Sequence, residues 1–154
     1  MDKKVSLVPC YTDRELYLSL AKDYIAELGT FDSKIRWDED AMLHLMWSAS
    51  FIMEDRTIQG FVITEEVQFK VFEDLLYIEE FYVVPEERHR GVGLAAVKAA
   101  VSKWRGDVFL YILERNYAAQ NFWLVVEREL GWERIQRPEI RQEKGCELMV
   151  YKTS

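Results

Sequence analysis

Residues 75–95 read LLYIEEFYVVPEERHRGVGLA, and they determine most of the expected fold. The segment Leu75–Val84 is a nearly continuous apolar run, which is typical of a central strand covered on both faces. Pro85 ends this strand, a helix is predicted over Val92–Trp104, and a further strand is predicted at Asp107–Leu113. This strand–loop–helix–strand unit predicts a right-handed parallel crossover.

The flanking sequence adds further elements. Strands are expected at Val5–Val8, Ser50–Met53, Thr57–Thr64, Trp132–Gln136 and Glu147–Lys152, and helices from Thr12 or Asp13 to Gly29, from Asp38 to Ala49 and over Ala118–Leu130. Gly60 predicts a bulge in its strand. The expected order is β-α-α-β-β-β-α-β-α-β-β, which indicates an α/β protein with a mixed sheet rather than a doubly wound one. No linker or repeat interrupts the sequence, so a single domain over residues 1–154 is expected.

The composition limits the partners. Apolar residues make up 49% of the 154 residues, and 20 Lys and Arg against 27 Asp and Glu give a formal net charge of −7. An acidic surface repels phosphate backbones and anionic lipid, so neither nucleic acid nor a membrane is an expected partner. The same charge favours a cationic small molecule or a basic peptide.

Neither a metal site nor a disulfide framework is expected. The only cysteines, Cys10 and Cys146, and the only histidines, His44 and His89, show no ligand spacing. Packing is the favoured role of both cysteines, and His44 is expected to be a partly buried structural residue. The sequence shows no signal peptide and no apolar run long enough to span a membrane, so a cytoplasmic protein is expected.

The loop before the predicted helix is the main candidate site. Two glycines two positions apart let the backbone approach a ligand, and exposed N–H groups at a helix N-terminus bind anions. Arg88 and Arg90 add positive charge, so residues 88–94 are interpreted as a pyrophosphate cradle. The alternative is a glycine-rich turn with two solvated arginines. Residues 91–96 also fit the dinucleotide pattern GxGxxA, but only one crossover unit is present, which disfavours a dinucleotide fold.

Three motifs in sequence order resemble the GCN5-related N-acetyltransferase (GNAT) family. They are Arg88-His89-Arg90-Gly91-Val92-Gly93, the preceding strand end Phe81-Tyr82-Val83-Val84-Pro85-Glu86, and Asn116-Tyr117-Ala118-Ala119-Gln120-Asn121-Phe122-Trp123. Gly131-Trp132 follows where relatives commonly have Gly-Phe. The expected order of elements also matches the family fold. The chain is therefore similar to this family, in a subtype with Phe-Trp in place of the usual Phe/Leu-Tyr.

The resemblance implies acetyl-CoA as co-substrate and assigns a set of residues to it. The pantetheine arm would pair with backbone groups of Phe81 and Val83, and Asn116 and the helix carrying Trp123 would lie along the arm. The pyrophosphate would bind to the loop residues Arg88, His89, Arg90, Gly91, Val92, Gly93 and Leu94.

The implied reaction is direct attack of a primary amine on the thioester, which requires a base. Glu79 and Glu80 are the candidates because they interrupt an apolar strand beside the expected cofactor site. They point to opposite faces of a regular strand, and a bulge would exchange those faces. A structural carboxylate is the alternative for either. Trp123 stands where many relatives have a tyrosine acid, so Tyr111 or Tyr117 substitutes for it or the thiolate leaves unassisted.

The acceptor is not specified by any motif. A small amine or basic peptide is expected from the net charge, and pairing into a homodimer is possible through the C-terminal strands. An aromatic cage from Tyr24, Phe31, Trp37 and Trp47 is one interpretation, and ordinary packing of these residues is favoured over it. The alternative function is a non-catalytic module that binds or senses acyl-CoA.

Overall fold

The computed structural model describes residues 4–71 and 73–153, which form two compact units. The first unit comprises residues up to Thr64 together with Glu80–Lys103. The second comprises Glu65–Glu79 and the chain from Trp104 onward. The single domain expected over residues 1–154 stays a prediction.

The order of helices and strands is the predicted one. The strands are β1 (Ser6–Pro9), β2 (Ala49–Glu54), β3 (Thr57–Lys70), β4 (Glu73–Val83), β5 (Val108–Leu113), β6 (Glu133–Arg134) and β7 (Cys146–Lys152), and the α-helices are α1 (Arg14–Gly29), α2 (Glu39–Leu45), α3 (Val92–Val101) and α4 (Tyr117–Leu130). Short 3-10 turns add η1 (Cys10–Thr12), η2 (Met46–Ser48) and η3 (Pro85–Glu87). The strands are hydrogen-bonded in the order β1-β2-β3-β4-β5-β7-β6.

The sheet is mixed, as expected. β4 and β5 are parallel, which confirms the predicted parallel crossover through α3. The pairs β1–β2, β2–β3, β5–β7 and β6–β7 are antiparallel. The predicted fold class, an α/β protein with one mixed sheet, is therefore confirmed.

Several boundaries differ from the prediction. Helix α2 ends at Leu45 rather than at Ala49, because the chain passes through η2 into β2 at that point. β3 continues past Thr64 to Lys70, because Val67 and Phe69 alternate with polar residues and pack on the second unit's core. Helix α3 ends at Val101 rather than at Trp104. β6 has only two residues, because the chain leaves the sheet after Arg134.

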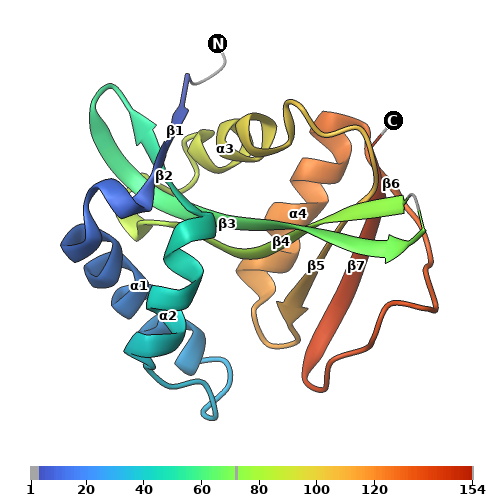
Figure 1. Ribbon diagram of the computed structural model, residues 1–154, viewed down its shortest axis with the longest axis horizontal. Coiled ribbons are helices and arrows are strands. Elements are labelled where there is room, and N and C mark those ends of the chain that lie inside the picture. The colour runs from blue at the N-terminus through green and yellow to red at the C-terminus, as the bar shows by residue number, and fades with distance from the viewer. Residues whose placement is uncertain (1–3, 72, 154) are drawn as a thin grey trace. The chain divides into compact units, whose positions relative to one another are not determined.

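The core of the first unit lies between α1, α2 and the strands β2 and β3. Tyr17 and Tyr24 of α1 pack edge-on against Phe61 of β3, with ring centroids 5.7 and 5.5 Å apart. The Tyr17 hydroxyl donates a 2.6 Å hydrogen bond to the carbonyl of Met42, which joins α1 to α2. In Figure 1, α3 lies on the opposite side of these strands from α1 and α2. Both faces of this part of the sheet are therefore covered.

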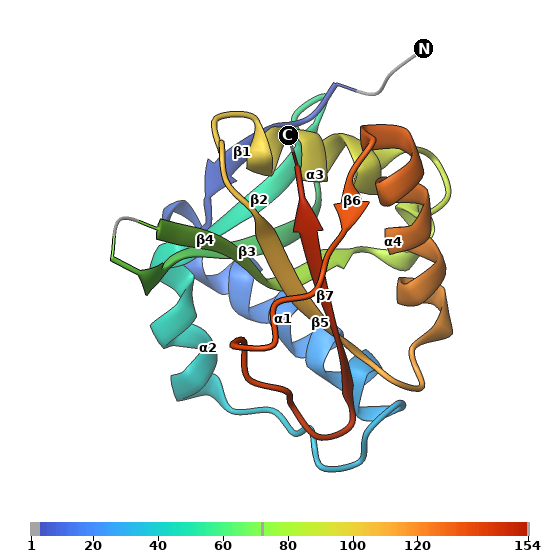
Figure 2. The same cartoon turned by 90° about the vertical axis from the view of Figure 1, so that its right-hand side faces the viewer.

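The second unit has its own apolar cluster on β4, β5 and β7. Tyr77 of β4 stacks on its register partner Phe109 of β5, with centroids 4.7 Å apart. Ile140, from the long segment between β6 and β7, is buried in the same cluster. Figure 2 shows this segment running beside β5 and β7.

Arg137 fastens that segment to the strands of the second unit. Its guanidinium donates to Glu73 at 2.6 Å and to Asp107 at 2.8 Å, and it lies 5.4 Å from the ring centroid of Phe69. These side-chain hydrogen bonds raise the pKa of Arg137 above its ordinary value. The Tyr111 hydroxyl donates to the carbonyl of Arg141 further along. The segment is therefore anchored at two points as well as by Ile140.

The bulge predicted at Gly60 is present. The β2–β3 register shifts between Ile52, paired with Gly60, and Met53, paired with Ile58, so Gln59 is the extra residue. A Cβ built on Gly60 would lie 1.8 Å from the carbonyl oxygen of Tyr82 in β4. Only a residue without a side chain fits between these two strands.

We predict that Gly60→Ala lowers the free energy of unfolding by about 3 kcal/mol, because the methyl group forces two backbones apart. Urea unfolding followed by circular dichroism measures the change. Gly145→Ala is the control: its added Cβ meets nothing within 4 Å, so its cost comes from the positive φ alone and is expected to be about 1 kcal/mol. Equal costs for the two variants would contradict the close approach at Gly60.

Candidate functional site

The loop between β4 and α3 is built by two left-handed residues. The 3-10 turn Pro85–Glu87 follows β4, and the chain then reverses through His89 at φ +63° and Gly91 at φ +85°. His89 and Gly91 are both exposed. Glycine adopts this conformation without steric cost, which explains why it stands where the helix begins.

Helix α3 differs from the other α-helices at its N-terminus. In α1, α2 and α4 the side chains of Asp13, Asp38 and Asn116 accept a hydrogen bond from a first-turn N–H group. Gly91 precedes α3 and supplies no such side chain. The first N–H groups of this ten-residue helix, together with its dipole, therefore offer positive potential to an anion.

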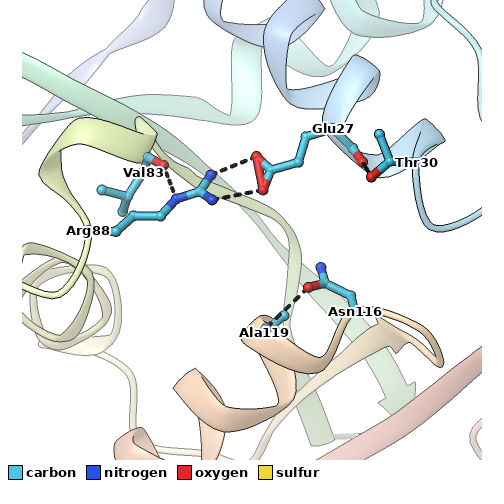
Figure 3. A network of polar contacts seen from close by, with 6 residues as sticks. All are labelled: Glu27, Thr30, Val83, Arg88, Asn116 and Ala119. Atoms are coloured by element: carbon cyan, nitrogen blue, oxygen red, sulfur yellow. Dashed lines mark hydrogen bonds and ion pairs between the residues drawn. The ribbon is translucent and has the colours of Figure 1, made fainter.

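The Arg88 side chain points away from the helix start and toward α1. Its Nη1 and Nη2 donate to the two carboxylate oxygens of Glu27 at 2.8 and 2.7 Å, and its Nε donates to the carbonyl of Val83 at 2.8 Å (Figure 3). The guanidinium carbon also lies 5.6 Å from the ring centroid of Tyr82. The hydrogen bonds with Glu27 raise the pKa of Arg88 above its ordinary value.

Arg90 is also held by carboxylates. It forms an ion pair with Glu87 in the same loop and lies 3.7 Å from the carboxylate of the buried Glu54 at the end of β2. Each loop arginine therefore has an acidic partner within the first unit. The attraction of the loop for an anion thus comes from backbone N–H groups more than from the two guanidinium charges.

The end of β4 leads directly into this loop. The N–H of Val84 donates to the carbonyl of Gln59 in β3 at 2.8 Å. Because a trans peptide directs its N–H and C=O to opposite sides, the Val83 carbonyl faces away from β3, where Arg88 binds it. At Val83, only the N–H group is therefore available for strand-like pairing with a ligand. The assignment of Phe81 and Val83 to the pantetheine amides stays a prediction.

Glu79 and Glu80 lie in β4 between residues that pack in two different clusters. Leu75 and Tyr77 pack in the cluster of the second unit, whereas Tyr82 packs in that of the first. Both glutamates are half-buried, and each has one carboxylate oxygen shielded from solvent. Partial burial suits a proton acceptor, and the choice between the two stays open.

In the second unit, Asn116 has a local role that the sequence analysis missed. Its Oδ1 accepts from the N–H of Ala119 at 3.1 Å and so begins α4 (Figure 3). The signal was available, since asparagine is a preferred N-cap residue. The indole of Trp123 is buried and meets the ring of Phe122 edge-on at 5.1 Å.

The two tyrosines considered as acids differ in surroundings. Tyr111 donates its hydroxyl proton to the Arg141 carbonyl, and its pKa is raised above the ordinary value, mainly by burial. Tyr117, the first residue of α4, is exposed. Tyr111 therefore holds its proton in a structural hydrogen bond.

The two cysteines and His44 differ in burial. Cys10 is fully buried, as expected, and burial raises the pKa of its thiol to about 12, while Cys146 is half-buried. His44 is exposed, so its expected partial burial is wrong, because α2 turns this position away from the core.

The aromatic residues of the α1–α2 region differ in their surroundings. Tyr24 and Trp37 pack in or against the core of the first unit. Trp47 is 72% exposed and its ring lies 5.6 Å from that of Tyr11. Packing is therefore the role of the first two, as favoured from the sequence.

Within residues 4–71 and 73–153, no group of three or more His, Cys, Asp and Glu side chains is arranged to hold a metal ion. No helix in that part of the chain is long and apolar enough to cross a membrane.

Solved structures share this fold over nearly the whole chain. Diaminobutyrate acetyltransferase EctA from Paenibacillus lautus, in complex with L-2,4-diaminobutyric acid and coenzyme A, has a TM-score of 0.65 at 14% identity, covering 98% of this chain and 96% of its own. A GNAT family acetyltransferase from Bacillus cereus has a TM-score of 0.65 at 20% identity, covering 99% and 97%. NAA60 from Arabidopsis thaliana, in complex with a bisubstrate analogue, has a TM-score of 0.64 at 16% identity, covering 97% and 98%.

At these identities the structural likeness establishes the fold, and the sequence itself establishes the family. No curated protein matches the chain in sequence. Residues 13–131, however, match the sequence profile of the acetyltransferase (GNAT) family, a range that includes α1, the loop between β4 and α3, and α4. The chain therefore belongs to the acetyltransferase (GNAT) family of acyl-CoA-dependent N-acetyltransferases.

Proposed function

We propose that this chain transfers an acetyl group from acetyl-CoA to a primary amine by direct attack of the amine on the thioester. The observation that carries the proposal is the start of α3, a helix preceded by a left-handed glycine with no capping side chain. A pyrophosphate supplies the acceptor oxygens that Asp13, Asp38 and Asn116 supply to the other three helices. Family membership supports acetyl-CoA as the molecule that brings it.

The residues assigned from the sequence bind the pyrophosphate and the pantetheine arm of acetyl-CoA in this proposal. The loop residues Arg88, His89, Arg90, Gly91, Val92, Gly93 and Leu94 bind the pyrophosphate, chiefly through their N–H groups. Phe81 and Val83 pair with the pantetheine amides. Asn116 contacts the pantetheine arm through Nδ2, because its Oδ1 caps α4, and Trp123 lines the arm.

The proposed reaction removes two protons from the ammonium group of the acceptor. An amine is protonated at neutral pH, so Glu79 or Glu80 first takes a proton from it, directly or through water. The amine nitrogen then attacks the carbonyl carbon of the thioester. The carbon–sulfur bond breaks as the amide forms, and the thiolate of coenzyme A leaves and takes up the second proton that the nitrogen loses. The acetylated amine, coenzyme A and one proton are released.

The acceptor that we propose is a cationic small amine or the basic end of a peptide. The formal net charge of −7 attracts such molecules and repels polyanions. Among the similar folds, one is described with a diamino acid and another with a bisubstrate analogue, at identities of 14% and 16%. A cytoplasmic location and a homodimer remain predictions.

We predict that Gly91→Glu weakens acetyl-CoA binding at least about 100-fold, because a carboxylate enters the phosphate path and repels the ligand. Isothermal titration measures the dissociation constant, with NADH as the ligand control. Gly145→Glu is the matched control, since Gly145 also has a positive φ and lies in the second unit. Unchanged affinity in Gly91→Glu would remove the loop from the binding site.

For the base, we predict that replacing the acting glutamate by glutamine lowers kcat about 10²-fold and abolishes the acid limb of the pH–rate profile. Glu79→Gln and Glu80→Gln are compared with Glu66→Gln, an exposed glutamate of β3. The assay measures release of coenzyme A with a thiol reagent. Full turnover by both test variants would exclude these residues as the base.

The same assay separates an enzyme from a non-catalytic binding module. Amine-dependent release of coenzyme A across a panel of diamines, amino acids and basic peptides is the expected result. Tight binding of acetyl-CoA without release by any amine in the panel would favour the module instead.

A further inference from the structure

An arginine in a loop that binds phosphate has one of two roles. One is direct contact with phosphate, and the other is to fix the loop that makes the contact. The guanidinium has three fixed acceptors: both carboxylate oxygens of Glu27 and the carbonyl of Val83, all within 2.8 Å. Paired planar hydrogen bonds of this kind are the strongest that arginine makes, and they hold it in one orientation.

The surroundings of Glu27 indicate that this pairing is a built feature. Glu27 lies in the last turn of α1, where the helix dipole disfavours a carboxylate and where α1 has no basic residue. The backbone there is fixed, because the N–H and hydroxyl of Thr30 both donate to the Glu27 carbonyl (Figure 3). Arg88 therefore supplies the positive charge that this end of α1 lacks.

The ion pair is protected on one side by an aromatic ring. The Tyr82 ring lies beneath the guanidinium, and the side chains of Arg88 and Glu27 are only 33% and 31% exposed. Burial and the nearby carboxylates of Asp23 and Glu27 raise the pKa of Tyr82, so its ring stays neutral. Partial shielding from water makes this pair stronger than an exposed one.

We propose that Glu27 and Arg88 form a clamp that positions the phosphate-binding loop, and that neither side chain is a ligand of the phosphate. The inference rests on the proposed function and names two positioning residues for it. The clamp fixes the two ends of the turn, since Arg88 stands in the loop and Val83 ends β4. Backbone N–H groups that are already oriented bind an anion without the entropy cost of ordering the loop.

The test uses a double-mutant cycle on acetyl-CoA binding, with Glu27→Gln, Arg88→Gln and the double variant. Because both residues act through one contact, each single change is expected to weaken binding about tenfold, and the double change also about tenfold. Loss of loop order raises the KM for acetyl-CoA and leaves kcat at saturation within about twofold. Glu127→Gln is the matched control, because it breaks a 2.7 Å ion pair with Arg134 in the second unit.

The sign of the Glu27→Gln effect decides between the two roles of Arg88. If Arg88 were a phosphate ligand, removing the charge of Glu27 would release the guanidinium, and acetyl-CoA would bind equally well or more tightly. Such a result, or a double variant about 100-fold weaker, would overturn the clamp.

Hydrogen exchange of the ligand-free protein tests the clamp without the cofactor. Glu27→Gln is expected to increase exchange at the amides of residues 86–91, while exchange in β5 and β7 stays unchanged. Unaltered exchange in the loop would overturn the inference. Failure of the unmodified protein to bind acetyl-CoA would instead overturn the proposed function, so the two failures are distinguishable.

Discussion

One planar side chain connects α1 to the loop after β4 in the first unit. Arg88 reaches from the loop after β4 to the last turn of α1, and it satisfies three acceptors at once. An arginine in this position joins the loop and the neighbouring strand end to a helix that is 61 residues away in sequence. A lysine would offer one point charge and could not reproduce the two parallel hydrogen bonds to Glu27. The geometry of the loop thus follows from a side-chain contact as well as from its glycines.

The same arrangement bears on how an acidic protein presents the phosphate site that we propose. Arg90 is balanced by Glu54 and Glu87, and Arg88 is balanced by Glu27. The loop therefore carries little excess side-chain charge, and its attraction for an anion comes from N–H groups at the start of α3. Such groups have fixed directions, so they select phosphate geometry where a flexible cation would select charge alone.

Much of the fold could be predicted from local patterns. The apolar run at residues 75–84 predicted the central strand, and Gly60 predicted the bulge that the register shift confirms. The extension of β3 to Lys70 was not predicted, because Glu65 and Glu66 resemble the solvent-exposed end of a strand. In the structure, Val67 and Phe69 pack against the cluster on β4 and β5 and so continue the strand. The exposure of His44 was missed for a related reason: the direction of a short helix is set by what packs beneath it.

The sequence by itself determined the order of elements and the mixed sheet, and it led to the proposal of a phosphate site in the loop after β4, because each depends on the spacing of residues close together in the chain. Only the tertiary structure decided what the side chains of that loop do. Arg88 and Glu27 are 61 residues apart, and nothing in the local pattern around either one names the other. A glutamate in the last turn of α1 is unfavourable alone and becomes favourable when folding brings a guanidinium to it. Charge signs can be read from a sequence, whereas the pairing of charges depends on distances that exist only after the chain has folded.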